Sequence, residues 1–178
     1  MKIGILADSH DHVVNLKKAI TFFNAEKVEL IYHCGDWVSP FVFEFLYWEC
    51  KPEAPVKGVF GNNEGDRFRI VERISTHKLP VVIRQHTLAE EVDDKRIIIY
   101  HGQDKAITST LINSGTYDLV LTGHTHLPLT EMVGKTLHIN PGTTCDAAQS
   151  KIIETPTVAI YDSNLNEARI VEFLKEVK

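Results

Sequence analysis

Apolar residues along the first two thirds of the chain follow two alternating spacings. Short runs such as Ile3 to Ala7 and Leu30 to Cys34 are almost wholly apolar, as in strands that are buried on both faces. Between these runs, apolar residues recur at steps of three and four, which predicts an amphipathic helix from about His12 to Glu26. The opening of the chain therefore indicates a strand–helix–strand unit.

The same alternation continues further along the chain. It predicts strands at Val56 to Phe60, Val81 to Arg84, Arg96 to Tyr100 and Leu119 to Thr122. It predicts helices at Asp66 to Thr76 and Lys105 to Asn113, and one with Pro40 in its first turn and Ser39 as its cap. The last third predicts strands at Leu129 to Val133, Thr136 to Asn140, Thr157 to Tyr161 and Glu167 to Glu172. We read the charged stretch Glu90 to Arg96 as a solvated hairpin tip.

A chain that begins with strand–helix alternation and ends in hairpins predicts an α/β (α+β) fold. We expect two sheets packed face to face with helices outside them. Prolines and glycines are scattered at turns, and no stretch has the composition of a linker, so we expect residues 1–178 to form a single domain.

Composition narrows the classes of partner. The hydrophobic content of 43% and charged content of 24% are ordinary for a globular protein. The formal net charge of -5 argues against an extended basic surface for nucleic acid or anionic lipid. It is compatible with a phosphate substrate, because divalent cations in a cleft invert the local field.

Cysteine usage and hydropathy bear on the compartment. The three cysteines, Cys34, Cys50 and Cys145, are odd in number and share no CxxC spacing, which favours free thiols in a reducing compartment. We find no signal-peptide pattern and no apolar run of the ~20 residues that a membrane span needs. We therefore expect a soluble, cytoplasmic protein without a membrane partner.

Five short polar segments each follow a predicted strand. They are Asp8-Ser9-His10, Gly35-Asp36, Gly61-Asn62-Asn63-Glu64, His101-Gly102 and Gly123-His124-Thr125-His126. Each alone is ordinary turn chemistry, but ligands in open α/β sheets gather at the carboxyl ends of strands. Imidazole and carboxylate groups without thiolate favour Mn, Fe, Zn, Ni or Co over calcium. Together the segments predict a site for two metal ions, which suits attack on phosphate esters.

These segments resemble the five signature blocks of the calcineurin-like metallophosphoesterases, and in particular the short bacterial and archaeal phosphodiesterases of that superfamily. The later Asn140-Pro141-Gly142-Thr143 is similar to a turn of the same family. The resemblance implies a four-layer αββα sandwich of two mixed sheets and a phosphoric ester hydrolase that uses a metal-activated water. It also implies the ligands: one metal would take Asp8, His10 and His126, the second Asn62, His101 and His124, and Asp36 would bridge them. We expect two divalent ions, Mn first, with Ni, Zn, Fe, Co or Mg as alternatives.

The chain departs from the family pattern at Asn63, where many members have a histidine that contacts substrate and protonates the leaving group. An asparagine cannot act as an acid, and a positioned general acid is worth about 10²–10⁴ in rate. We place Asn63 facing the substrate and expect slow turnover of esters with poor leaving groups.

Two other readings stay open. One is a weakly catalytic scaffold of the same fold, like the retromer coat subunit, and the other is an ordinary α/β domain whose loop histidines coincide by chance. We favour an enzyme acting on a small phosphoester, with a homo-oligomer suggested by the aromatic cluster at Phe41 to Trp48. Two histidines outside the blocks receive no role: we expect His33 in a core or edge position and His138 on the surface.

Overall fold

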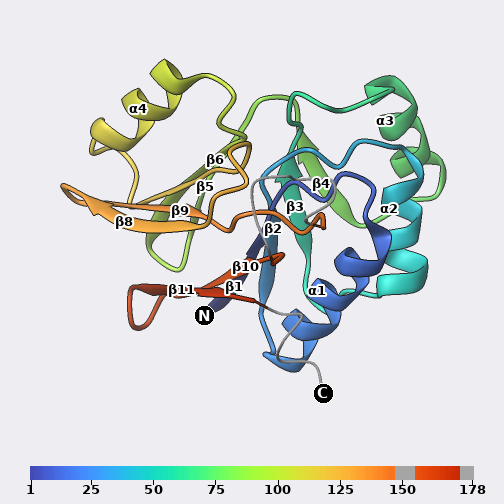
Figure 1. Ribbon diagram of the computed structural model, residues 1–178, viewed down its shortest axis with the longest axis horizontal. Helices are drawn as coiled ribbons and strands as arrows, with labels where there is room; N and C mark the ends of the chain where they lie inside the picture. The colour runs from blue at the N-terminus through green and yellow to red at the C-terminus, as the bar shows by residue number, and fades with distance from the viewer. Residues whose placement is uncertain (147–154, 173–178) are drawn as a thin grey trace.

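The computed structural model describes residues 1–146 and 155–172. Figure 1 shows four layers side by side: α4, a first sheet, a second sheet, and a helical layer of α1, α2 and α3. The predicted fold class, a four-layer sandwich of two mixed sheets flanked by helices, is confirmed.

The six-stranded sheet lies against the helical layer and has the order β11-β10-β1-β2-β3-β4. Its strands are β1 (Lys2–Leu6), β2 (Leu30–His33), β3 (Val56–Val59), β4 (Val81–Arg84), β10 (Val158–Asp162) and β11 (Glu167–Val171). Strands β1 to β4 are parallel, whereas β10 and β11 are antiparallel to their neighbours. The loops after β1, β2 and β3 therefore leave the sheet at one edge.

The five-stranded sheet lies under α4 and has the order β5-β6-β7-β9-β8. Its strands are β5 (Thr87–Val92), β6 (Lys95–Tyr100), β7 (Leu119–Leu121), β8 (Leu129–Val133) and β9 (Thr136–Asn140). Strands β6, β7 and β9 are parallel, so the loops after β6 and β7 also leave at a common edge.

The helices are α1 (Val13–Ala25), α2 (Phe41–Phe45), α3 (Arg67–Thr76) and α4 (Lys105–Asn113), and a π-helix, η1 (Leu46–Cys50), continues α2. Side chains cap three of them: His12 accepts from Asn15 N–H, Asp66 from Arg69 N–H, and Asp104 from two N–H groups of α4. The predicted cap of α2 is wrong, because the Ser39 hydroxyl donates to Asp11 instead. No described helix is long and apolar enough to span a bilayer.

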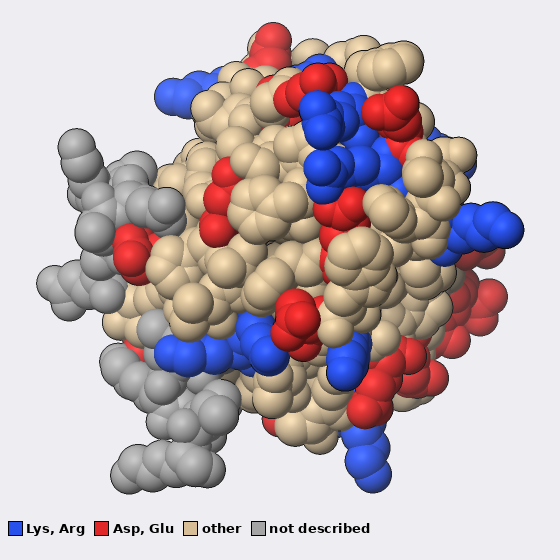
Figure 2. All heavy atoms as spheres, turned by 90° about the vertical axis from the view of Figure 1, so that its right-hand side faces the viewer, with Lys and Arg blue, Asp and Glu red and all other residues tan. Residues whose placement is uncertain are grey.

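Alternate residues of β1 pack to opposite sides of the six-stranded sheet. Ile3 and Ile5 lie in the layer between the two sheets, whereas Leu6 faces the helical layer. Gly4 also faces the helices, where a Cβ atom would lie 3.0 Å from the Phe23 ring. Figure 2 shows the outer face of the helical layer, where acidic and basic side chains are interspersed and basic ones gather near the upper edge beside acidic ones.

Hydrogen bonds between polar side chains join the two sheets at one side of the core. Glu90, on β5, accepts from the Tyr32 hydroxyl at 2.5 Å and from Lys57 Nζ at 2.6 Å, and both donors belong to the six-stranded sheet. The expectation that Glu90 to Arg96 is only a solvated hairpin tip is therefore wrong for Glu90. The hairpin is longer than predicted, since β5 already begins at Thr87.

Candidate metal centre

The seven predicted metal ligands come together where the carboxyl edges of the two sheets meet. Asp8, His10, Asp36 and Asn62 follow β1, β2 and β3 of one sheet, and His101, His124 and His126 follow β6 and β7 of the other. The two sheets therefore each contribute part of the predicted ligand set.

One group of ligand atoms consists of Asp8, His10 and His126. The Nε2 atoms of the two imidazoles lie 3.1 Å apart. His126 Nε2 is 3.5 Å from Asp8 Oδ1, and His10 Nε2 is 3.9 Å from the same oxygen. One potential ligand atom of each side chain thus faces the same small volume, with these atoms within 4.8 Å of one another, as a cation site requires.

A second group lies beside it and centres on Asn62. Its Oδ1 atom is 3.0 Å from His101 Nε2 and 2.9 Å from His124 Nδ1. His101 Nδ1 donates to the Cys34 carbonyl at 2.8 Å, which leaves Nε2 facing Asn62 and Asp36. The orientation of His101 is that of a ligand held by the backbone behind it.

Asp36 lies between the two groups. Its Oδ2 atom is 3.5 Å from His10 Nε2, and its Oδ1 atom is 3.4 Å from His101 Nε2. Each carboxylate oxygen is therefore directed at a different group, which is the arrangement a bridging carboxylate needs.

A buried oxygen tests whether divalent cations fit this donor set. Asp8 is fully buried, and within the described residues its Oδ1 has no partner at hydrogen-bond geometry. An unpartnered buried carboxylate oxygen is costly, and a cation among the imidazoles facing it would remove that cost. The residues present fit the metals that the family resemblance implies.

The two carboxylates make the site favour positive charge. Burial by itself lowers the pKa of His126, but Asp8 and Cys145 beside it together raise that pKa to about 10. Burial also opposes ionisation of Asp36, yet hydrogen bonds from His101 and Asn63 hold the pKa of its carboxyl below the usual range. Such a field suits cations.

The backbone is strained at five of the seven predicted ligands. Asp8, His10, Asp36, His124 and His126 have φ of 52°, 42°, 60°, 66° and 62°, in the left-handed region that residues with side chains avoid. Each such residue costs about 1–3 kcal/mol and persists only where its surroundings enforce it. The interactions that enforce it should therefore be visible behind the ligands.

Glu64 is one of these supports, and sequence reasoning assigned it no role. Its carboxylate accepts from Gly61 N–H at 2.6 Å, Asp36 N–H at 3.1 Å and Val38 N–H at 3.2 Å. It thereby joins the loop of the predicted bridging aspartate to the loop that carries Asn62. Glu64 ends one of the five polar segments, but its position in the sequence does not show which backbone N–H groups it meets.

The Asn140-to-Thr143 turn is a second support. Asn140 Nδ2 donates to the Gly123 carbonyl at 2.8 Å and to Thr125 Oγ1 at 3.0 Å, which fixes the loop of His124 and His126. Thr143 Oγ1 donates to the Asp8 carbonyl at 2.6 Å. This turn thus joins ligand loops from both sheets.

Two glycines leave room for the carboxylates. A Cβ atom on Gly61 would lie 2.1 Å from Asp36 Oδ1, and one on Gly123 would lie 2.7 Å from Asp8 Oδ2. Any side chain at either position would displace a predicted ligand.

Asn63 is bound to Asp36. Its Nδ2 donates to Asp36 Oδ2 at 2.7 Å and its N–H donates to Asp36 Oδ1 at 2.9 Å. The residue is exposed at the rim of the site, so contact with substrate stays a prediction.

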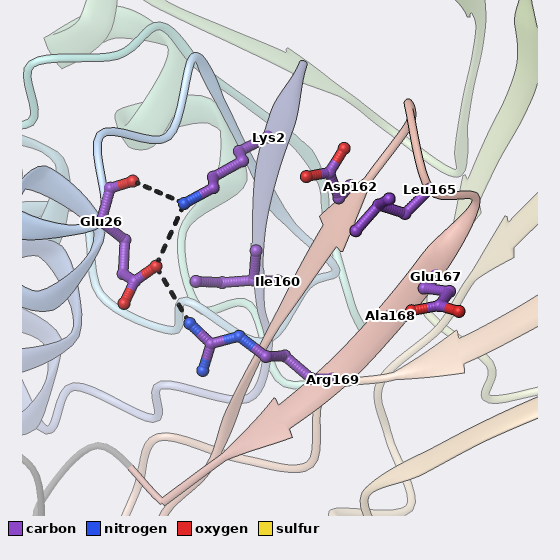
Figure 3. A pocket seen from close by; sticks show the side chains of 8 residues that line it. All are labelled: Lys2, Glu26, Ile160, Asp162, Leu165, Glu167, Ala168 and Arg169. Atoms are coloured by element: carbon purple, nitrogen blue, oxygen red, sulfur yellow. Dashed lines mark hydrogen bonds and ion pairs between the residues drawn. The ribbon is translucent and has the colours of Figure 1, made fainter.

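Two cavities lie at opposite ends of β1. One, of about 350 Å³, is lined by His10, Val38, His126 and Cys145 and opens onto the first ligand group. The other, of about 260 Å³, lies at the amino end of β1, where Lys2 and Arg169 both reach Glu26 (Figure 3).

The fold and the clustered donors define a metallophosphoesterase. The sequence model described as the calcineurin-like phosphoesterase superfamily domain matches residues 1–165. The chain belongs to this superfamily, as its motifs predicted.

A curated sequence and a solved structure, each of an archaeal phosphodiesterase, are similar to this chain over nearly its whole length. A phosphodiesterase of Methanocaldococcus jannaschii is 39% identical over 172 residues, which cover 95% of this chain and 97% of that protein. A solved archaeal phosphodiesterase superposes with a TM-score of 0.84 at 37% identity, covering 96% of this chain and 99% of that one.

More distant structures share the fold alone. Vps29 of Entamoeba histolytica, solved with Zn²⁺, superposes with a TM-score of 0.64 at 16% identity and covers 97% of this chain and 99% of its own.

The predicted positions of two histidines outside the motifs can be compared with the structure. His138 is buried, with Nε2 2.9 Å from Thr122 Oγ1, so its predicted surface position is wrong. His33 is wholly buried at the end of β2, as a core position predicts.

Proposed function

We propose that this protein is a metal-dependent phosphodiesterase that holds two divalent ions at the Asp36 cluster, meaning the seven predicted ligands Asp8, His10, Asp36, Asn62, His101, His124 and His126. The observation that carries the proposal is the position of Asp36, whose two oxygens face separate groups of donors. Family membership supports hydrolysis of phosphoric esters, and the similarity to archaeal phosphodiesterases supports a diester.

Asp8, His10 and His126 would hold one ion, and Asn62, His101 and His124 the other, with Asp36 shared. When bound, the ions would lower the pKa of a water toward neutral and take up charge on the phosphate oxygens. The chain's own part is orientation: Cys34 fixes His101, and Asn63 holds the Asp36 carboxylate by two hydrogen bonds.

The donor set supports Mn²⁺ as the first choice, with Ni²⁺, Zn²⁺, Fe²⁺, Co²⁺ or Mg²⁺ as alternatives. A small phosphoester is supported by the size of the cavity beside His10, about 350 Å³. The described cysteines are free thiols, which supports a cytoplasmic location. We retain the prediction of a single domain.

The aromatic cluster supports a proposal of self-association. Phe41 and Trp48 are 44% and 54% exposed on α2 and η1. Sedimentation of the purified protein tests this, and a monomer at high concentration contradicts it.

The test of the function is a metal-dependent assay. Protein stripped with a chelator and reloaded with Mn²⁺ should bind two equivalents and hydrolyse bis-(para-nitrophenyl) phosphate, and stripped protein should be inactive. Activity in stripped protein contradicts the proposal. Binding of two ions without hydrolysis of any mono- or diester would favour the scaffold alternative, to which Asn63 lends weight.

A further inference from the structure

His33 is a buried histidine that the proposed metal centre does not use as a ligand. It ends β2, two residues before Gly35, and its side chain is wholly excluded from solvent. Buried polar groups in proteins are hydrogen-bonded, so the partners of its two ring nitrogens show what it does.

The partners fix both the charge and the tautomer of the ring. Gly35 N–H donates to His33 Nδ1 at 3.2 Å, so Nδ1 carries a lone pair and the imidazole is neutral. The proton is therefore on Nε2, which lies 3.1 Å from Ser9 Oγ and donates to it. Burial lowers the pKa of His33 well below its usual value, in agreement with this neutral form.

Ser9 links His33 to the predicted ligand Asp36 through two hydrogen bonds. It lies between Asp8 and His10 in sequence, is fully buried, and donates through Oγ to the Asp36 carbonyl at 3.5 Å. The ring thus connects the loop after β1 to the loop after β2, both of which have left-handed residues that need support.

The ring itself is held in place by packing. Trp37 stacks on it with ring centroids 3.5 Å apart and an angle of 15°, and Trp37 Nε1 donates to the Val59 carbonyl on β3 at 3.1 Å. Gly58 makes this approach of strands feasible, because a Cβ atom there would lie 2.5 Å from the His33 carbonyl. A ring fixed on three sides can set the position of the loops that it bonds.

We propose that His33 is a positioning residue whose neutral imidazole fixes the Asp8–His10 loop to the Gly35–Asp36 loop and so sets where Asp36 presents its oxygens. The role rests on the proposed metal centre but is independent of which ester is hydrolysed. Removing the ring's hydrogen bonds should weaken metal binding and disturb the spacing of the two ions, because groups that orient metal ligands typically contribute about 10–100-fold to affinity.

A set of variants separates positioning from packing. His33→Phe keeps an aromatic ring against Trp37 and loses both hydrogen bonds, whereas His33→Asn keeps an acceptor for Gly35 N–H and is too short for Ser9. The matched control is Tyr32→Phe, which is in the same strand, is equally buried and loses a hydrogen bond to Glu90 on the opposite sheet.

The readout is Mn²⁺ binding by calorimetry together with the electron paramagnetic resonance signal of an exchange-coupled Mn²⁺ pair. In His33→Phe we expect the Kd for Mn²⁺ to rise about 10–100-fold and the coupled signal to weaken. Tyr32→Phe should lose stability but keep the Kd and the signal of the natural protein. An unchanged Kd and signal in folded His33→Phe, or equal losses in both variants, would overturn the proposal.

If His33→Phe does not fold, His33→Asn and Ser9→Ala carry the test. Both remove the same histidine–serine hydrogen bond, so each should raise the Kd, and the double variant should lose less affinity than the two single losses combined. Fully additive effects, or none, refute the role. Failure of the natural protein to bind Mn²⁺ would instead refute the metal centre, and binding without hydrolysis would refute only the proposed activity.

Discussion

The two ends of β1 show two ways of using carboxylates. At the amino end, Glu26 accepts from Lys2 Nζ at 3.5 Å and from Arg169 Nη2 at 3.0 Å, and all three side chains are partly exposed. At the carboxyl end, Asp8 is fully buried with an oxygen that lacks a hydrogen-bond partner among the described residues. The first arrangement pairs its carboxylate with two cationic side chains, whereas the second leaves a buried oxygen that a cation would satisfy.

The two ends of β1 also differ in backbone strain, which is a free-energy cost of folding. None of Lys2, Glu26 and Arg169 has a left-handed backbone, whereas several predicted ligands of the Asp36 cluster do. Strain of about 1–3 kcal/mol at each such residue must be offset by supports such as Glu64 and Asn140. The contrast teaches that a pocket alone does not mark function, since both ends of β1 have one.

The largest effect should come from removing the charge of Asp36. Asp36→Asn leaves an amide where a shared carboxylate is needed, so we expect kcat on an aryl diester to fall at least about 10²–10³-fold. Glu26→Gln is the matched carboxylate-to-amide change at the other end and should leave kcat unchanged. A large loss in Glu26→Gln, or full activity in Asp36→Asn with normal circular dichroism, would break the comparison.

The next effect concerns the missing acid. Asn63→His places a proton donor at the rim, and a positioned acid is worth about 10²–10⁴ in rate. The gain should appear for alkyl-like leaving groups and be small for aryl ones, so the slope of rate against leaving-group pKa should flatten. An unchanged slope counts against this reading of Asn63.

A smaller effect should follow from Glu64→Gln. An amide can still accept some of the three N–H groups but places its own N–H against another, so we expect a loss of about 1–3 kcal/mol in the free energy of unfolding. The Kd for Mn²⁺ should rise in parallel, since Asp36 loses its backbone support. The exposed Glu72 on α3 provides the control, and Glu72→Gln should change neither quantity.

The smallest effect should be that of Glu26→Gln on the free energy of unfolding. Exposed ion pairs contribute up to about 1 kcal/mol, so denaturant unfolding should shift by no more than that. The shift should shrink in high salt because exposed charges are screened. A larger, salt-independent loss would show that this end is less like an ordinary surface than its exposure indicates.

The periodicity of apolar residues was sufficient to predict helices and strands whose pattern is local. The predicted helix at Lys105 to Asn113 and the strands at Leu129 to Val133 and Thr136 to Asn140 match the structure residue for residue. The predicted ligands were recognisable because each directly follows an apolar strand. Their assignment to two metals stays a prediction.

The sequence did not reveal contacts that depend on how separate segments are oriented in the folded structure. Glu64 accepts from three N–H groups in two loops, the one after β2 and its own after β3, and no spacing rule encodes that convergence. His138 was placed on the surface because it matches no motif, yet its strand β9 lies between β7 and β8, where Thr122 partners it. Strand β5 was not predicted, because Thr87, Glu90 and Glu91 hide the apolar pattern of a strand whose residue Leu88 is buried.

The division of donors between the sheets has a thermodynamic consequence. The predicted ligands Asp8, His10, Asp36 and Asn62 follow strands of one sheet and His101, His124 and His126 follow strands of the other, so neither sheet alone has a complete set. Each bound ion would act as a non-covalent cross-link across the hydrophobic layer between them. By mass action, a free ion concentration of 100 times Kd would add about 2.7 kcal/mol to the free energy of unfolding. The melting temperature should therefore report occupancy of the centre even in variants that turn over no substrate.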